Sequence, residues 1–184
     1  MELTRSIRDA FGWPKDDKNC KEEVEFCRKD IEMNENNLVL LLGSLEKGSF
    51  SGAVKLVKAI FLAQSEAKHK GLTGNFSYNF YRWDYGPFDS AIYKDLESLR
   101  SKGLLQINQE YTPYLEKTYA LTEAGQKQFK KVKAEVDTTF GTIVSKWANK
   151  VNQMRRDDVL KFVYDKSNVK SYEMGDKVNL PDVD

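Results

Sequence analysis

The sequence predicts a mainly α-helical domain with a small β-hairpin, arranged as a winged helix-turn-helix with a long C-terminal helix. Three observations support this fold class. Helical periodicity dominates the chain, two short strand-like runs flank a proline-containing turn, and the elements follow the order helix, helix, strand, helix, hairpin, long helix. In a winged helix-turn-helix, the third helix of this order reads DNA and the hairpin is the wing.

The length of the chain bounds the number of domains. Its 184 residues, of which 40% are hydrophobic, suffice for one proper core but not for two full domains. We expect a winged-helix domain over residues 36–151, preceded by an N-terminal accessory arm over residues 1–35. A short helix and a polar tail are expected over residues 152–184.

The domain is expected to begin with a short buried helix. The apolar run LVLLLG at 38–43 indicates this helix, which Asn36 or Asn37 is expected to cap and which is expected to end near Gly48. The small polar residues of SFSG at 49–52 then predict a turn before the second helix.

The second helix and the strand after it have clear periodicities. Apolar residues recur at three- and four-residue steps over 53–67, so we predict an amphipathic helix that Gly71 ends. Aromatic residues then alternate with polar ones over 76–80, as in a half-buried strand. Gly86 and Pro87 are expected to end this strand.

The third helix is predicted over residues 87–102, with Pro87 as its first residue. Proline suits that position because its missing N–H group would have no partner there, and Gly103 is expected to close the helix. One face carries a regular apolar stripe, formed by Phe88, Ile92, Leu96 and Leu99. The helix therefore buries one face and presents the other.

A hairpin and a long helix are predicted to complete the domain. Two short strands lie at 104–109 and 115–122, around a turn marked by Pro113. One long helix is expected over 122–151, with a kink at Gly141, and a further short helix over DDVLKFVYDK. The apolar residues of the long helix exceed one buried face of a small domain, so homodimerisation through it is expected.

Several motifs of the chain resemble a known family. FYRWDYGPFDSAIYKDLESLRSKGLL, followed by YALTEAGQK and VLKFVYDK, is similar to the YwgA-like proteins and the Panacea-type domains of SocA-like antitoxins. The resemblance covers roughly residues 38–166, and its most specific element is Tyr85-Gly86-Pro87-Phe88. It implies a winged-helix module, used for DNA binding in regulators and for protein contacts in antitoxins.

The leading hypothesis is that the chain binds double-stranded DNA as a transcriptional regulator. Residues 38–151 carry 16 basic against 11 acidic residues, which permits DNA binding, although the third helix itself has no net charge. The candidate DNA contacts are the polar residues on the exposed face of that helix and the one cation of the wing. They are Ser90, Tyr93, Lys94, Glu97, Arg100, Lys102 and Lys117.

The alternative hypothesis is a non-catalytic protein-interaction module of the antitoxin or adaptor kind, with a toxin as its partner. Seven aromatic residues lie between Phe76 and Phe88, and most of them fit the core. Tyr81 and Tyr85 are expected to be the most exposed, and they are the candidate contacts for a protein partner.

An enzyme, a metal site and a membrane protein are all disfavoured. His69 is the single histidine, and Cys20 and Cys27 have no second pair with which to bind zinc. GSLEKGSF at 43–50 has Ser-Phe where a phosphate-binding loop needs Lys-Ser or Lys-Thr. The longest apolar run, LVLLL, is far too short to span a membrane. We therefore expect a cytoplasmic protein without a cofactor.

Overall fold

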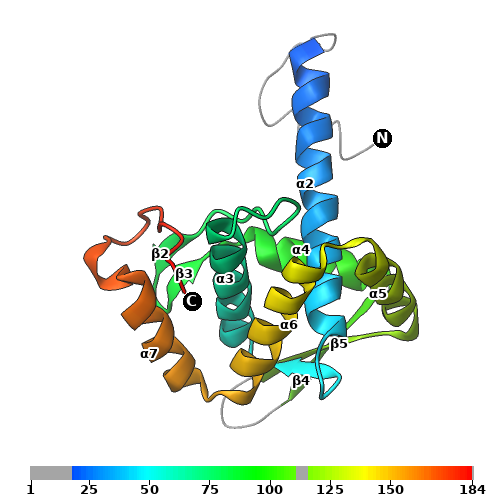
Figure 1. Ribbon diagram of the computed structural model, residues 1–184. Helices are drawn as coiled ribbons and strands as arrows, with labels where there is room; N and C mark the ends of the chain where they lie inside the picture. Colours follow the sequence, from blue (N-terminus) through cyan, green and yellow to red (C-terminus); the bar gives the residue numbers. More distant parts are fainter. Residues whose placement is uncertain (1–17, 111–115, 184) are drawn as a thin grey trace.

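The computed structural model describes residues 18–110 and 116–183, leaving aside the side chains of 18–24, 26, 27 and 110. Within these residues the fold is mainly helical, with small antiparallel sheets (Figure 1). The helices are α2 (Lys18–Gly43), α3 (Ala53–His69), α4 (Ala91–Ser101), α5 (Glu123–Glu135), α6 (Thr138–Gln153), α7 (Arg156–Ser167) and the 3-10 turn η1 (Val169–Ser171). The strands are β1 (Ser49–Ser51), β2 (Tyr81–Trp83), β3 (Gly86–Phe88), β4 (Leu105–Glu110) and β5 (Glu116–Leu121).

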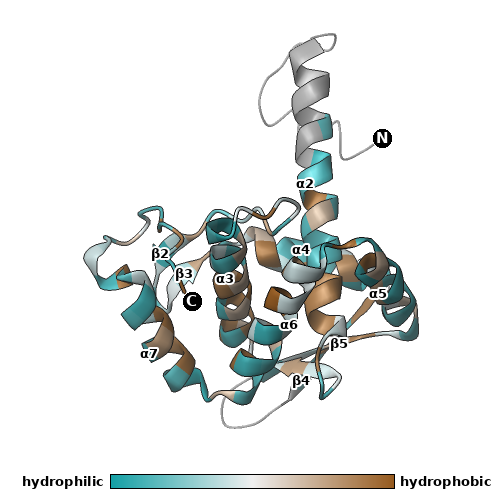
Figure 2. Ribbon diagram, viewed as in Figure 1, coloured by the Kyte–Doolittle hydropathy of each residue, from teal (hydrophilic) through white to brown (hydrophobic). Residues whose placement is uncertain are grey.

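Helix α3 is the centre of the molecule. Every residue from Lys55 to Ala67 is buried, because α3 packs against α6, α7, β3 and the sheet (Figure 1). The predicted helix over this stretch is confirmed, including its end at Gly71, which has a φ of 66°. Hydrophobic residues line the inward sides of the surrounding helices, as Figure 2 shows for α6 and α7.

Helix α2 runs without a break across the predicted boundary at residues 35 and 36. The prediction that Asn36 or Asn37 caps a new helix is wrong, since neither lies at a helix start. Asn37 donates instead to the carbonyl of Gly74 at 3.0 Å, and Asn34 accepts from the Ser77 N–H group at 2.9 Å. These asparagines therefore tie α2 to the segment that leads into β2.

The three-stranded sheet contains one strand that the sequence did not predict. Residues 49–51, expected to be a turn, form β1, which pairs antiparallel with β5 from Ser49 opposite Ala120 to Ser51 opposite Thr118. The predicted hairpin is confirmed as β4 and β5, and the strand order is β1-β5-β4. The turn predicted around Pro113 lies outside the described residues.

The predicted long helix over 122–151 is two helices, so that prediction is wrong. Thr122 caps α5 as expected, accepting from the Gly125 N–H group at 3.1 Å. The chain turns out of the helix at Val136, and Asp137 then caps α6 by accepting from the Phe140 N–H group at 2.9 Å. An N-cap residue, rather than a kink at Gly141, therefore breaks the helix.

The apolar face of α6 is buried within the chain, mainly against α3. Its members are Phe140, Ile143, Val144, Trp147, Ala148 and Val151. One copy of the chain therefore covers the apolar residues of α6, whereas Phe129 and Val136 are only partly buried. Homodimerisation stays a prediction.

Residues 86–88 belong to a strand and not to a helix, so the predicted start of the third helix at Pro87 is wrong. Gly86, Pro87 and Phe88 form β3, and α4 begins only at Ala91. The local cause is Asp89, whose Oδ1 accepts from the Ala91 N–H group at 2.9 Å. The predicted end at Gly103 is confirmed by its φ of 70°.

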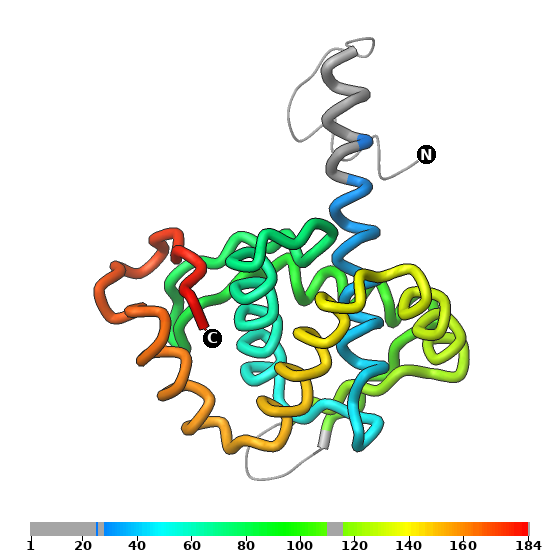
Figure 3. The backbone as a smooth tube through the Cα atoms, viewed as in Figure 1, coloured from blue at the N-terminus to red at the C-terminus, as the bar shows by residue number. Residues whose placement is uncertain are grey.

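The C-terminal segment packs on the body of the molecule. After α7, which confirms the predicted short helix, the chain returns beside β2 and α3 (Figure 3). The backbone carbonyl of Asp176 accepts from the Arg82 N–H group at 2.8 Å, and the Val178 N–H group donates to the Phe80 carbonyl at 2.8 Å. In the part of the chain described, no helix is both long and apolar enough to cross a bilayer.

Candidate protein-binding surface

Strands β2 and β3 form a short hairpin whose outward side is aromatic. Tyr81 pairs with Phe88 and Trp83 with Gly86, so Asp84 and Tyr85 form a two-residue turn. Gly86 has a φ of 84°, which a side chain would strain, and this explains the glycine directly after the turn. The hairpin therefore projects Tyr81, Trp83 and Tyr85 away from the core.

Four aromatic side chains around this hairpin are exposed, and we call them the aromatic patch. The exposed fractions are 42% for Tyr81, 51% for Trp83, 51% for Tyr85 and 36% for Tyr93 of α4. Phe88 connects two of them, because its ring centroid lies 6.5 Å from that of Trp83 and 5.7 Å from that of Tyr93. Tyr81 lies opposite Phe88 in the hairpin. Exposed apolar groups that gather in one place are typical of interaction sites.

The inner side of the hairpin is held by α3 and α7. Lys58 of α3 is only 2% exposed, and its Nζ donates to the Pro87 carbonyl at 2.6 Å. Burial, together with the charge of Arg82, lowers the pKa of Lys58 to about 7. Tyr164 of α7 donates to the Asp84 carbonyl at 3.3 Å and its ring lies beneath Gly86. The patch is thus carried by a braced element.

The segment that enters the hairpin is anchored as well. Phe76, Tyr78 and Phe80 are buried, which confirms their predicted alternation, although residues 76–80 form no regular strand. The Tyr78 hydroxyl donates to Asp95 of α4 at 2.7 Å. Burial raises the pKa of Asp95 to about 6, and Glu35 and Asp89 add to this rise while Tyr78 and Lys102 oppose it.

A comparison with known families bears directly on this region. The family model described as antitoxin SocA-like, Panacea domain, matches residues 56–168. The chain belongs to this family. The resemblance noted in the sequence is therefore confirmed, and the match contains both hairpins and every residue of the aromatic patch. Neither the curated proteins nor the solved structures contain a match to the chain.

The motif that carried the Panacea resemblance, Tyr85-Gly86-Pro87-Phe88, is the turn and second strand of the hairpin. Tyr81 and Tyr85, the predicted partner contacts, are both exposed. Sequence reasoning missed Trp83, which is as exposed as Tyr85. Its signal was present, because Tyr81 and Trp83 are two residues apart in a strand and share one face.

The predicted DNA contacts lie around α4 and the second hairpin, but their cations are partly neutralised. Arg100 lies 2.9 Å from Glu97, and Lys102 lies 2.5 Å from Glu35 of α2. Ser90 is exposed immediately before α4 and makes no side-chain cap, and Lys94 is exposed on α4. Contact of these residues with DNA remains a prediction.

Three of the predicted DNA contacts meet in one cleft between α4 and the β4–β5 hairpin. Tyr93 and Glu97 of α4 and Lys117 of β5 line it, and its volume is about 330 Å³. Burial raises the pKa of both Tyr93 and Tyr119, which also lines the cleft, so both phenols stay neutral at ordinary pH. The cleft adjoins the aromatic patch through Tyr93.

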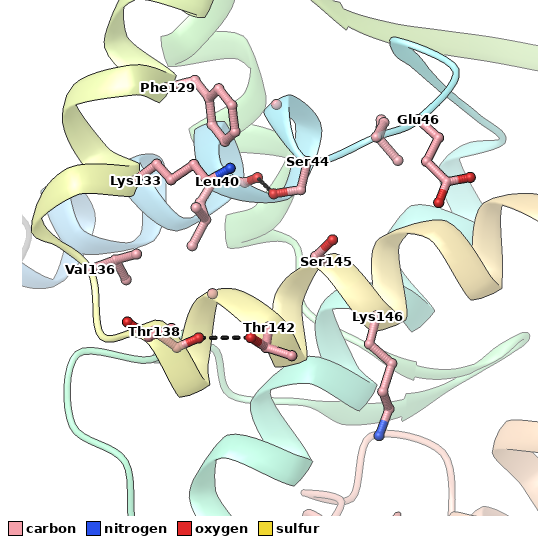
Figure 4. Close-up of a pocket in the computed structure, with 13 residues that line it drawn as sticks. Leu40, Ser44, Glu46, Phe129, Lys133, Val136, Thr138, Thr142, Ser145 and Lys146 are labelled. Atoms are coloured by element: carbon pink, nitrogen blue, oxygen red, sulfur yellow. Dashed lines mark hydrogen bonds between the residues drawn. The ribbon is translucent and has the colours of Figure 1, made fainter.

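A larger groove of about 700 Å³ lies between the end of α2, α5 and α6, and two of its hydroxyl groups donate to backbone carbonyls (Figure 4). Ser44 donates to Leu40 at 2.7 Å and Thr142 donates to Thr138 at 2.9 Å. In the described part of the chain, no histidine or carboxylate is hydrogen-bonded to either hydroxyl, as an activated nucleophile would require. Lys146 points out of the groove toward Glu66.

Two further titratable groups, Glu66 and His69, have structural partners. Glu66 of α3 accepts from Lys146 and Trp147 at 2.6 Å and from Lys70 at 2.7 Å. Burial raises its pKa, but these hydrogen bonds outweigh burial and hold it below its ordinary value. His69 lies 3.1 Å from the Leu180 carbonyl. Among the described residues no group of acids, histidines or cysteines is arranged to hold a metal, and the Cys20 and Cys27 side chains fall outside them.

Proposed function

We propose that this Panacea-family chain is a non-catalytic protein-binding module of the antitoxin kind, and that its toxin partner docks on the aromatic patch. The observation that carries the proposal is the exposure of Tyr81, Trp83 and Tyr85 on one braced hairpin. The family description supports it, because SocA-like proteins are described as antitoxins.

The chemistry of the patch suits a protein partner. Tryptophan and tyrosine are enriched among the residues that dominate binding energy at interfaces, because they bury a large area with few rotatable bonds. Lys58 and Tyr164 hold the hairpin backbone from beneath, so little order has to be gained on binding. A partner that covers the patch would remove its aromatic surface from water.

DNA binding is the second candidate, and the topology favours it. A strand between the first two helices that pairs with the hairpin, in the order β1-β5-β4, fits a winged helix in which α4 is the reader and β4–β5 the wing. The charges favour it less, because Arg100 and Lys102 are paired with carboxylates. We therefore place the winged-helix regulator below the protein-binding module.

A growth assay tests the leading proposal. A neighbouring gene whose product stops growth when expressed alone should be neutralised by co-expression of this chain. Trp83→Ser combined with Tyr85→Ser should abolish the rescue while leaving the melting temperature of the purified chain within a few degrees, because both side chains are exposed. Lys130→Ala combined with Lys131→Ala changes two exposed residues of α5 and serves as the control that still rescues. Rescue by the Trp83/Tyr85 variant would contradict the proposal.

A DNA-binding assay further distinguishes the two candidate functions. The protein-binding module should not shift a duplex of mixed sequence at about 50 mM salt, where a reader with several phosphate contacts binds even non-specifically. A shift that Lys94→Ala with Arg100→Ala weakens, and whose salt slope falls by about one per lost contact, would restore the regulator as the first candidate.

A further inference from the structure

A separate pocket opens between the start of α3 and the start of α7, next to the aromatic patch. Its volume is about 400 Å³. The lining comes from three stretches that are distant in the sequence. The lining residues are Gly52, Ala53, Val54, Lys55, Glu116, Met154, Arg155 and Arg156.

The lining of this pocket is cationic. Lys55, Arg155 and Arg156 face one carboxylate, that of Glu116. Lys55 is 8% exposed, and its Nζ donates to the carbonyls of Asn152 at 3.0 Å and Met154 at 3.2 Å. The amino group of Lys55 is thus hydrogen-bonded to uncharged backbone carbonyls. Burial, partly offset by Glu116, lowers the pKa of Lys55, and the nearby charge of Lys47 lowers it further.

The backbone adds to the positive potential of the pocket. Helices α3 and α7 both begin here, and the residues that precede them, Gly52 and Arg155, supply no side-chain cap. Helix N-termini favour anions because their first N–H groups lack intrahelical partners. Asp157 and Asp158 in the first turn of α7 offset part of this, and Asp157 lies 3.5 Å from the Arg156 guanidinium.

The cationic pocket, as we call it, is joined to the aromatic patch. The Arg156 guanidinium carbon lies 5.9 Å from the centroid of the Tyr85 ring, within the range of a cation–π contact. A ligand that covers Tyr85 therefore meets Arg156 at the rim of the pocket. One continuous surface carries both an aromatic group and a cationic pocket.

We propose that the cationic pocket receives a carboxylate of the protein partner, from an Asp or Glu side chain that lies beside the apolar residue seated on the aromatic patch. This inference rests on the proposed function and adds the chemistry of the partner segment. A protein carboxylate fits better than a DNA backbone, because Glu116 in the wall and Glu97 near Tyr93 would repel a row of phosphates while tolerating one negative charge.

The test uses two blocked hexapeptides as probes. One contains two glutamates, a phenylalanine and a leucine, and the other is identical except that glutamine replaces each glutamate. Binding to the full chain is followed by the amide NMR signals of Gly52 to Lys55 and by titration calorimetry. The glutamate peptide should bind about 10-fold more tightly than the glutamine peptide, the scale of one charge-assisted contact.

Two matched variants localise the effect. Arg155→Gln with Arg156→Gln changes exposed residues and should remove the preference for glutamate. Lys130→Gln with Lys131→Gln changes the total charge equally, on α5, and should keep it. Equal affinities of the two peptides for the parent chain, or a preference that persists in the arginine variant, would overturn the proposal. A duplex that binds more tightly than the peptide and shifts the same amides would also overturn it.

The outcome for the pocket is separable from that for the proposed function. If the arginine variant still neutralises the toxin while the Trp83/Tyr85 variant does not, the carboxylate assignment fails and the protein-binding function stands. If neither variant affects neutralisation, the proposed function itself fails.

Discussion

The two hairpins of the domain expose opposite kinds of side chain. The β2–β3 hairpin presents Tyr81, Trp83 and Tyr85 to solvent, whereas the β4–β5 hairpin presents polar residues. The exposed polar residues of the second hairpin include Gln106, Asn108, Gln109 and Lys117. By element order alone, the second hairpin is the wing and the candidate for function. The side chains point instead to the first, because among the described residues of the two hairpins the exposed large apolar side chains all lie there.

The hairpins also differ in how they are held. β2–β3 is fixed from three sides, by Lys58 of α3, Tyr164 of α7 and Asp176 of the C-terminal segment. β4 is an edge strand whose ladder is made with β5. A surface that binds without rearrangement gains affinity from being held in advance. The comparison thus supports the braced aromatic hairpin as the recognition surface that we propose, and four changes test it.

The largest expected effect is on the glycines beside the two hairpins. Gly86→Val should lower the free energy of unfolding by about 3 kcal/mol, because φ is positive there and the new side chain meets the Tyr164 ring, 3.4 Å from the Cβ position. Gly103→Val, with a positive φ but open space around it, should cost about 1–2 kcal/mol. Denaturant unfolding measures both, and equal losses would contradict the bracing by Tyr164.

The second effect concerns the lysine beneath the first hairpin. Because the pKa of Lys58 falls from 10.5 to about 7 on folding, the unfolded chain holds a proton that the folded chain releases. Stability should therefore rise from pH 7 toward pH 10.5, by up to about 1.4 kcal/mol per pH unit. Lys58→Met should flatten this rise between pH 7.5 and 9. Lys117→Met, on the exposed surface of the second hairpin, should leave the rise in stability unchanged. A rise that persists in Lys58→Met would contradict the lowered pKa of Lys58.

A smaller effect is expected at Asp95, which anchors the segment before the first hairpin. Its pKa of about 6 in the folded chain, against an ordinary 3.8, means that the folded chain binds the extra proton. The stabilisation from this group is present below about pH 4 and is lost as the pH rises through 6. In Asp95→Asn the fall in unfolding free energy between pH 4 and 6 should be shallower than in the parent. Glu97→Gln, at an exposed site, is the control and should match the parent.

The smallest effect is expected from the predicted DNA contacts. Lys94→Ala with Arg100→Ala should change the affinity for the toxin partner by less than about twofold and the unfolding free energy by less than about 0.5 kcal/mol, since both residues are exposed on α4. Surface plasmon resonance with the immobilised partner measures the affinity. A loss as large as that of Tyr85→Ala would move the interface from the first hairpin to α4.

Much of the fold was predictable, because local signals in the sequence coincide with tertiary packing. The helix over 53–67 has an unbroken apolar period and Gly103 ends α4 as expected. The errors fell where two local signals compete. Pro87 is favourable at a helix start, yet α4 begins only at Ala91, whose N–H group donates to Asp89. Asp137 lies within a stretch of continuous helical periodicity, so its role as the N-cap of α6 was not predicted.

The candidate surface was predictable only in part. Tyr81 and Tyr85 were expected to be the most exposed of the seven aromatic residues, but Trp83 was not singled out among them. Strand β1 and the cationic pocket depend on contacts between residues more than 60 apart in the chain, such as Ser51 with Thr118 and Lys55 with Met154. Periodicity along the sequence carries no information about such contacts.

The affinity of the toxin partner for two matched variants, measured by titration calorimetry, tests the central claim most directly. Trp83→Ala removes an exposed aromatic side chain of the first hairpin, and Lys117→Ala removes the exposed cation of the second. We expect Trp83→Ala to weaken binding by about 30-fold, the scale of an interface hot spot of about 2 kcal/mol, and Lys117→Ala to change it by less than about twofold. The reverse order, with Lys117→Ala as the damaging change, would contradict the assignment of recognition to the aromatic hairpin.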